Sequence, residues 1–84
     1  MQDVSGIQEF VSYVVTGLAD RPENANVSRR QEGARHVFDV RVDEDDIGRL
    51  LGHSGNTVMA VRNLAAAAAA HQGIEVGVEV LEQE

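Results

Sequence analysis

The stretch that decides the fold is residues 47–56, IGRLLGHSGN. Gly52 and Gly55 enclose only His53 and Ser54, so this piece of backbone has almost no side-chain cover. Glycine also tolerates the positive φ angles of a tight turn. A helix that begins directly after the turn points its unpaired N–H groups outward, and phosphate is their natural ligand. The stretch therefore indicates an anion-binding turn, although helix turns also use glycine for steric reasons alone.

Helices are predicted on both sides of this turn, over residues 44–51 and 56–71, because apolar residues recur there at helical spacing. Gly73 follows the second helix in the usual C-terminal position. The inner stripe of that helix is expected to consist of Val58, Val61, Leu64, Ala65 and Ala68. The alanine run 65–70 is typical of a strong helix, and it also leaves open a smooth face for a second copy of the chain.

Four acids, residues 43–46, stand where the first of these helices begins. Acidic residues there cap the first turn and complement the helix dipole. A calcium loop would need oxygen ligands at alternate positions around a central glycine, and that pattern is missing. No metal and no cofactor are expected.

An earlier helix is predicted over residues 5–19, where Ser5 and Gln8 have the form of a capping box. Pro22 follows it, and the residue before a proline is pushed out of the helical region. The apolar face of this helix is expected to consist of Ile7, Phe10, Val11, Val14 and Leu18.

Three strands are predicted, over residues 26–31, 36–42 and 74–81. The middle one alternates, so that Phe38, Val40 and Val42 face one way, whereas Val37, Asp39 and Arg41 form a mostly polar open face. The order is then α-β-β-α-α-β. A strand that returns to its sheet after a helical crossover pairs in parallel. The fold class is therefore α+β, with a three-stranded mixed sheet and helices on one face.

Length and composition limit the function. Eighty-four residues make one domain with a modest core, and the chain contains no cysteine. No secretory signal or membrane-spanning run is visible, so an intracellular protein without membrane insertion is expected. The net charge is −7, which disfavours a general polyanion binder. Residues 29–62 are balanced, however, with six arginines and six acids.

An enzyme is not expected. His36, His53 and His71 are too far apart in the chain to form a helical metal pair, and no Ser-His-carboxylate set is suggested. The glycine turn also lacks the G-K-[ST] of a nucleotide-binding loop.

Residues 47–56 resemble the core motif of the KH domain, in which a glycine turn joins two helices. The helix and strand placed before this core resemble the type II arrangement. Over residues 5–82 the chain is similar to the small single-domain bacterial KhpA family, with matching segments at 18–23, 42–49 and 61–64. The resemblance implies a type II KH fold and a cytoplasmic RNA-binding protein acting as an RNA chaperone or post-transcriptional regulator. It further implies a homodimer, or a heterodimer with KhpB, linked to cell-wall growth and cell shape.

One residue departs from the family pattern. His53 stands where the family usually has Lys or Arg, and histidine is mostly neutral at pH 7. The chain also lacks lysine entirely. Both features lower the affinity for RNA that is expected of the isolated chain.

The resemblance places single-stranded RNA on the turn, with about four nucleotides clamped by the backbone of Gly52 and Gly55. Ser54 and Asn56 would add neutral hydrogen bonds. Arg49 is the favoured phosphate contact, whereas Arg62 is equally suited to an ion pair within the fold. The bases would follow an apolar groove beside strand 36–42 that consists of Ile47, Leu50, Leu51 and Val58, although Leu50 and Val58 are better core candidates. The alternative function is an oligomerisation or protein-interaction module that binds RNA weakly.

Overall fold

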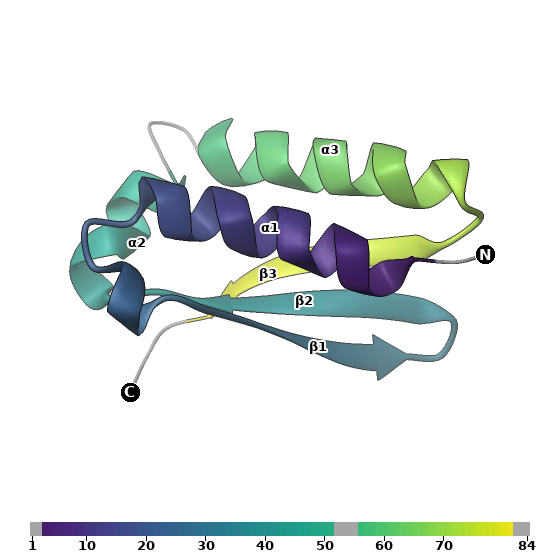
Figure 1. The fold of residues 1–84 in the computed structure, drawn as a ribbon, viewed down its shortest axis with the longest axis horizontal. Helices are drawn as coiled ribbons and strands as arrows, with labels where there is room; N and C mark the ends of the chain where they lie inside the picture. The colour runs from purple at the N-terminus through teal and green to yellow at the C-terminus, as the bar shows by residue number, and fades with distance from the viewer. Residues whose placement is uncertain (1–2, 52–55, 82–84) are drawn as a thin grey trace.

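The computed structural model describes residues 3–51 and 56–81. Its elements follow the order α-β-β-α-α-β, which confirms the α+β class (Figure 1). They are α1 (Val4–Leu18), the short 3-10 helix η1 (Pro22–Asn24), β1 (Asn26–Glu32), β2 (Arg35–Arg41), α2 (Glu44–Leu51), α3 (Asn56–His71) and β3 (Glu75–Leu81).

The sheet has the strand order β1-β2-β3 and is mixed. β1 and β2 form an antiparallel hairpin, whose turn contains Gly33 at a φ of 61°. β2 and β3 are parallel, with Phe38 opposite Val78, because α2 and α3 carry the chain back between them. Figure 1 shows the helices on one face of the sheet, with α1 and α3 side by side and α2 at one end.

The core lies between this helical layer and the sheet. Phe38 is its largest fully buried side chain and sits on the central strand. Val11 and Val15 of α1 and Ala65 of α3 cover it from above and are almost fully buried. An apolar stripe on each helix against one sheet face is the two-layer solution that these patterns favour.

The start of α1 differs from the prediction. Asp3, not Ser5, caps the helix, because its carboxylate accepts the Gly6 N–H at 2.9 Å. Gln8, the other half of the expected capping box, instead donates its side-chain amide to the Val27 carbonyl at 3.0 Å. Gln8 thus ties α1 to the β1 edge of the sheet.

The buried stripe of α3 is narrower than predicted. It runs through Val58, Val61, Ala65 and Ala69, whereas Leu64 is 58% exposed and Ala68 is exposed. At 100° per residue, Leu64 and Ala68 fall on the flank of the helix that faces α1, not the sheet. Gly73 ends α3 at a φ of 71°, as its position suggested.

The open face of the sheet is more buried than the alternation alone indicates, because Val37 is fully buried and Asp39 is 7% exposed. Arg30 lies across Asp39 with its Nε 3.0 Å from the carboxylate, and Arg35 covers Gly77, the partner of Val37. Long arginine side chains can bury apolar surface beneath their stems. The predicted alternation itself agrees with the core, which includes Phe38, Val40 and Val42 but not Val37.

Candidate nucleic-acid interface

The glycine turn connects two helices whose ends are well defined. α2 ends at Leu51 and α3 begins at Asn56, so the turn lies between a helix C-terminus and a helix N-terminus. Gly52, His53, Ser54 and Gly55 themselves lie outside the described residues, as do the side chains of Arg49 and Asn56. The site is therefore built from the surfaces that lead into the turn.

The exposed face of α2 carries a bare strip of backbone. Gly48 is exposed, and among the described residues no atom lies within 4 Å of where its Cβ would stand. Glycine inside a helix costs about 1 kcal/mol relative to alanine, so this position weakens α2 without any packing reason. Leu51, one turn further along on the same face, is 39% exposed. Together they form an open, apolar approach to the turn.

The apolar groove expected beside strand 36–42 is not present in the predicted form. Leu50 and Val58 are 3% and 5% exposed and belong to the core, the role the sequence favoured for them. β2 is the central strand, and its Phe38 is fully buried under the helices. Ile47 is partly buried against the same core, which leaves Leu51 as the exposed member of the predicted set.

Charge is distributed unevenly around this helical pair. The first turn of α2 carries Glu44, Asp45 and Asp46. The first turn of α3, directly after the glycine turn, carries no acid. The positive end of the α3 dipole is therefore not neutralised by its own side chains, which favours an anion at this end.

Arg62 of α3 makes a hydrogen bond to β3. Its Nε donates to the Val78 carbonyl at 2.9 Å. β3 is an edge strand, so part of its backbone lacks a strand partner, and Arg62 satisfies one of these carbonyls. Within the described part of the chain no contact is found for its two terminal nitrogens, which stay available to a phosphate.

Several other arginines are already engaged. Arg30 pairs with Glu32, Asp39 and Glu79 on the open face of the sheet. The hydrogen bonds to Asp39 and Glu32, led by the one to Asp39, raise the pKa of Arg30. Arg30 is therefore not free for a polyanion, although it counts among the six arginines of residues 29–62. Outside that segment, Arg21 lies within 4 Å of Asp43 and Asp45.

The acidic run forms a capped turn, in line with the interpretation from sequence. Asp43 accepts the Asp45 N–H at 3.0 Å and the Asn24 side-chain amide at 2.9 Å. These two hydrogen bonds, in that order, lower the pKa of Asp43. Among residues 3–51 and 56–81 no cluster of His, Cys, Asp or Glu could hold a metal ion.

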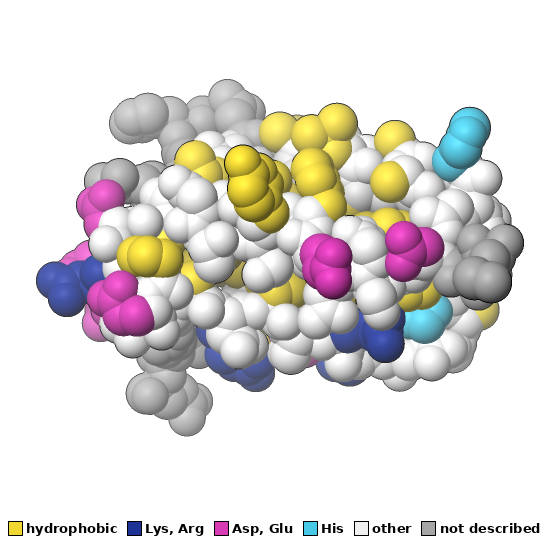
Figure 2. Space-filling model, viewed as in Figure 1, with side chains coloured by type: hydrophobic (Ala, Val, Ile, Leu, Met, Phe, Trp, Pro, Cys, Tyr) yellow, Lys and Arg dark blue, Asp and Glu magenta, His cyan; other side chains and the backbone are white. Residues whose placement is uncertain are grey.

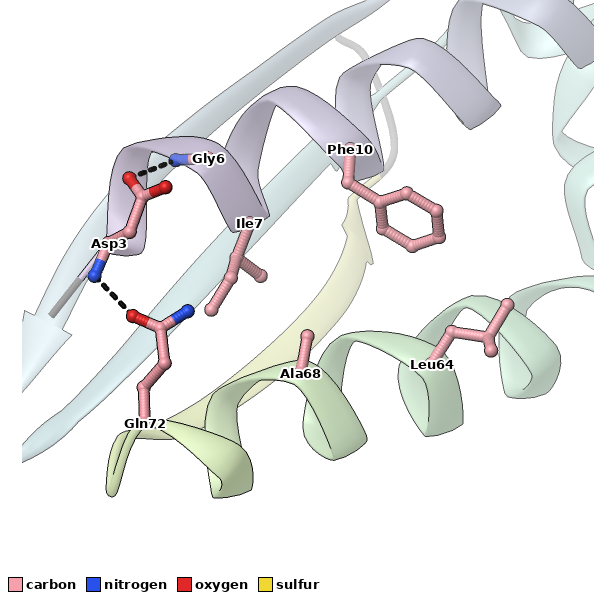
Figure 3. A pocket seen from close by; sticks show the side chains of 7 residues that line it. All are labelled: Asp3, Gly6, Ile7, Phe10, Leu64, Ala68 and Gln72. Carbon is pink, nitrogen blue, oxygen red and sulfur yellow. Dashed lines mark hydrogen bonds between the residues drawn. The ribbon is translucent and has the colours of Figure 1, made fainter.

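A hollow of about 430 Å³ lies away from the turn, between α1 and α3 (Figure 3). Ile7, Phe10, Leu64 and Ala68 form its apolar walls. Its polar end contains Asp3, Gly6 and Gln72, where the Asp3 N–H donates to the Gln72 side-chain oxygen. Figure 2 shows hydrophobic side chains gathered along this helical face. Sequence analysis assigned Leu64 and Ala68 to the core and so missed the hollow.

Two further residues of α2 escaped the sequence analysis. The sequence placed Gly48 only within the stretch 47–56, and Asp46 only among the four acids of residues 43–46. The structure separates them, since Gly48 has open space beside it and Asp46 is only 3% exposed. A mid-helix glycine was the available signal for the first, whereas the burial of Asp46 depends on contacts with residues far away in the chain.

No helix among the described residues has the length and apolarity needed to span a bilayer.

The architecture is that of a KH-like α+β domain. The chain resembles part of the crystal structure of an Aquifex aeolicus Era variant bound to GDP and AlF4⁻, with a TM-score of 0.62 and 17% sequence identity. The match covers 90% of this chain and 29% of the Era chain, so it shows the fold alone.

Sequence comparison then gives the family. The chain belongs to the KhpA/KhpB KH-domain family, whose model matches residues 8–80. A Chlamydia muridarum protein named RNA-binding protein KhpA is 31% identical over 77 residues, covering 92% of this chain and 99% of that protein. A Leifsonia xyli protein of the same name is 35% identical, and the match covers 81% of this chain and 90% of that protein. A Halalkalibacterium halodurans protein of that name is 28% identical, and the match covers 90% of this chain and 100% of that protein.

Proposed function

We propose that this protein is a non-enzymatic, cytoplasmic RNA-binding KH protein that takes single-stranded RNA on the turn between α2 and α3. The observation that carries the proposal is the bare face of α2, where Gly48 and Leu51 lead directly into Gly52–Gly55. The acid-free start of α3 and the name of the relatives support it.

The RNA backbone lies along the glycines, because only there can a phosphate approach main-chain N–H groups without meeting a side chain. Arg49, Ser54 and Asn56 supply side-chain contacts, and Arg62 adds its terminal nitrogens. Bases rest on Ile47 and Leu51. With so few cations the affinity is weak, and pairing two domains strengthens it through effective concentration. An RNA chaperone or post-transcriptional regulator that supports cell-wall growth and cell shape fits such binding.

The test is fluorescence anisotropy with short single-stranded RNA at low salt. His53→Asp and Gly52→Asp are expected to weaken binding at least tenfold, because each places a negative side chain where a phosphate docks. The matched control is Gln31→Asp, which adds the same charge on exposed β1 at the hairpin end. Equal binding by wild type and the turn variants, or no binding by wild type, would refute the proposal.

A second candidate function, a module that mainly self-associates, is favoured by the hollow between α1 and α3. Phe10 and Leu64 are 37% and 58% exposed beside it, and Tyr13 is 77% exposed on the same helix as Phe10. Within α1 the only charged residue is Glu9. Two copies of a chain with net charge −7 repel each other elsewhere, so this weakly charged face is where a second copy fits best. A standard interface needs about 800 Å² per partner, about 15% of the 5308 Å² surface.

Light scattering across a concentration series tests this function with two matched variants. Ala68 lines the hollow, whereas Ala66 is exposed on the opposite flank of α3. Ala68→Glu is expected to give a monomer, and Ala66→Glu to keep the wild-type mass. A wild-type monomer at all concentrations would refute self-association, and a complex formed only with an added KhpB-type protein would assign the face to a heterodimer.

A further inference from the structure

Asp46 is a buried carboxylate that joins two distant segments of the chain. It is the third residue of α2 and only 3% exposed. One carboxylate oxygen accepts the Asp20 N–H and the other accepts the Arg21 N–H, both at 3.0 Å. Both oxygens are therefore bonded to the backbone between α1 and η1.

Among the described residues, the surroundings of Asp46 offer no substitute partner. It borders a narrow void too small for a water molecule, whose other walls are Val15, Leu18, Ala19, Val42 and Leu50. The nearby guanidinium of Arg21 pairs with Asp43 and Asp45 instead. A buried carboxylate that lost its two N–H partners here would be left largely unpaired, because only 3% of the residue is exposed to solvent.

α2 depends on this contact for its direction. It is only eight residues long, and Leu50 is its single fully buried apolar side chain among those described. So short a helix has little stability of its own and is held by tertiary contacts. Leu50 and the partly buried Ile47 hold it against the core, while Asp46 holds its first turn to the segment after α1. Contacts at both ends of a short axis fix its orientation, which contacts at one end would not.

We infer that Asp46 is a positioning residue, which fixes the direction in which α2 presents Gly48, Leu51 and the glycine turn. This inference rests on the proposed function. Leu51, the last residue of α2, lies five residues beyond Asp46, about 7.5 Å along the helix axis. A tilt of about 10° at the Asp46 end would displace the helix end by about 1.3 Å. That is nearly half of a hydrogen-bond length, and enough to misplace a backbone that binds phosphate.

The sequence alone would rank the four acids equally, yet their neighbours differ. Asp43 and Asp45 meet Arg21 at the surface, and charged side chains gather at this end of the molecule (Figure 2). Removing the exposed charge of Asp45 changes little. Asn at position 46 would keep one acceptor and turn an amide N–H₂ towards a backbone N–H, so the clamp would lose half its hydrogen bonds and gain a repulsion.

The experiment compares Asp46→Asn with two controls. Asp45→Asn removes the same charge from a side chain that is 78% exposed. Val11→Ala lowers global stability through the core of α1, away from α2. Two readouts are taken where every variant is at least 95% folded: single-stranded RNA affinity, and amide hydrogen exchange of residues 47–51.

Compared with Val11→Ala at equal global stability, Asp46→Asn is expected to bind RNA at least tenfold more weakly. Its α2 amides are also expected to exchange at least tenfold faster. Asp45→Asn stays within twofold of wild type in both. If Asp46→Asn matches Val11→Ala in both readouts, the inference is overturned. If it fails to fold, Asp46→Ser, which keeps one acceptor, takes its place under the same criteria.

The two readouts separate this inference from the proposed function. Amide exchange needs no RNA, so it decides whether Asp46 holds α2 even if wild type proves not to bind RNA. In that case the proposed function fails, and faster exchange in Asp46→Asn still supports the clamp. Faster exchange together with unchanged RNA affinity would overturn the positioning role.

Discussion

Replacing Gly48 by alanine is expected to stabilise the protein and weaken RNA binding. Gly48 lies inside α2, and no described atom lies within 4 Å of its missing Cβ, so the added methyl meets no obstacle in the free protein. The gain in helix propensity is about 1 kcal/mol. For a domain of this size that raises Tm by about 4–8 °C.

The same methyl stands where RNA is proposed to approach. Carbon atoms pack at about 3.5–4.0 Å, so a sugar–phosphate chain lying on the bare backbone has to move outward by more than about 1 Å. An affinity loss of at least about tenfold, or about 1.4 kcal/mol, is expected. Thermal unfolding and anisotropy on the same preparation measure the two opposite effects.

The matched control is Gly17→Ala. Gly17 is exposed near the end of α1, and no described atom lies within 4 Å of its Cβ position either. It should raise Tm by a smaller amount, because it sits close to the helix end, and leave RNA affinity unchanged. If Gly48→Ala gains stability and binds RNA like wild type, the open face of α2 is not part of the interface.

Three further predictions concern charged residues. Arg62→Ala should reduce the slope of log affinity against log salt concentration by about 0.7, the value of one phosphate contact on a single strand. The control Arg35→Ala, on the far face of the sheet, should leave the slope unchanged. Equal slopes for wild type and Arg62→Ala would remove Arg62 from the interface. Arg30→Ala should lower the urea midpoint of unfolding, because it leaves the Asp39 side chain, which is only 10% exposed, without its cation. An unchanged midpoint would show that solvent compensates the lost pair. The lowered pKa of Asp43 means that the folded state binds fewer protons than the unfolded state, so this stabilisation is present above the ordinary value of 3.8 and lost as pH falls through the lowered pKa. As pH is lowered from 6 to 3, the free energy of urea unfolding should therefore fall more steeply for wild type than for Asp43→Asn. Parallel curves of this free energy against pH would contradict the prediction.

The sequence was informative wherever a pattern repeats along one element. The helix-glycine-helix pattern of residues 44–71 led to the KH resemblance, and the family comparison bears it out. Gly73 ended its helix in the expected left-handed conformation. The patterns failed where two elements meet. Leu64 obeys the apolar spacing of α3, yet it faces a hollow beside α1, and Val37 is fully buried although it lies outside the core cluster.

The order of the elements was determined by local chemistry, because backbone preference and apolar period act within about ten neighbouring residues. The mixed sheet followed from that order, since a strand that returns after a helical crossover pairs in parallel. Tertiary structure decided which of four adjacent acids is buried, which arginine holds an edge strand, and which apolar side chains stay exposed. Those outcomes depend on residues far away in the chain: Asp46 meets Asp20, and Arg30 meets Glu79. Only the folded arrangement brings such groups within the roughly 3 Å over which a hydrogen bond acts.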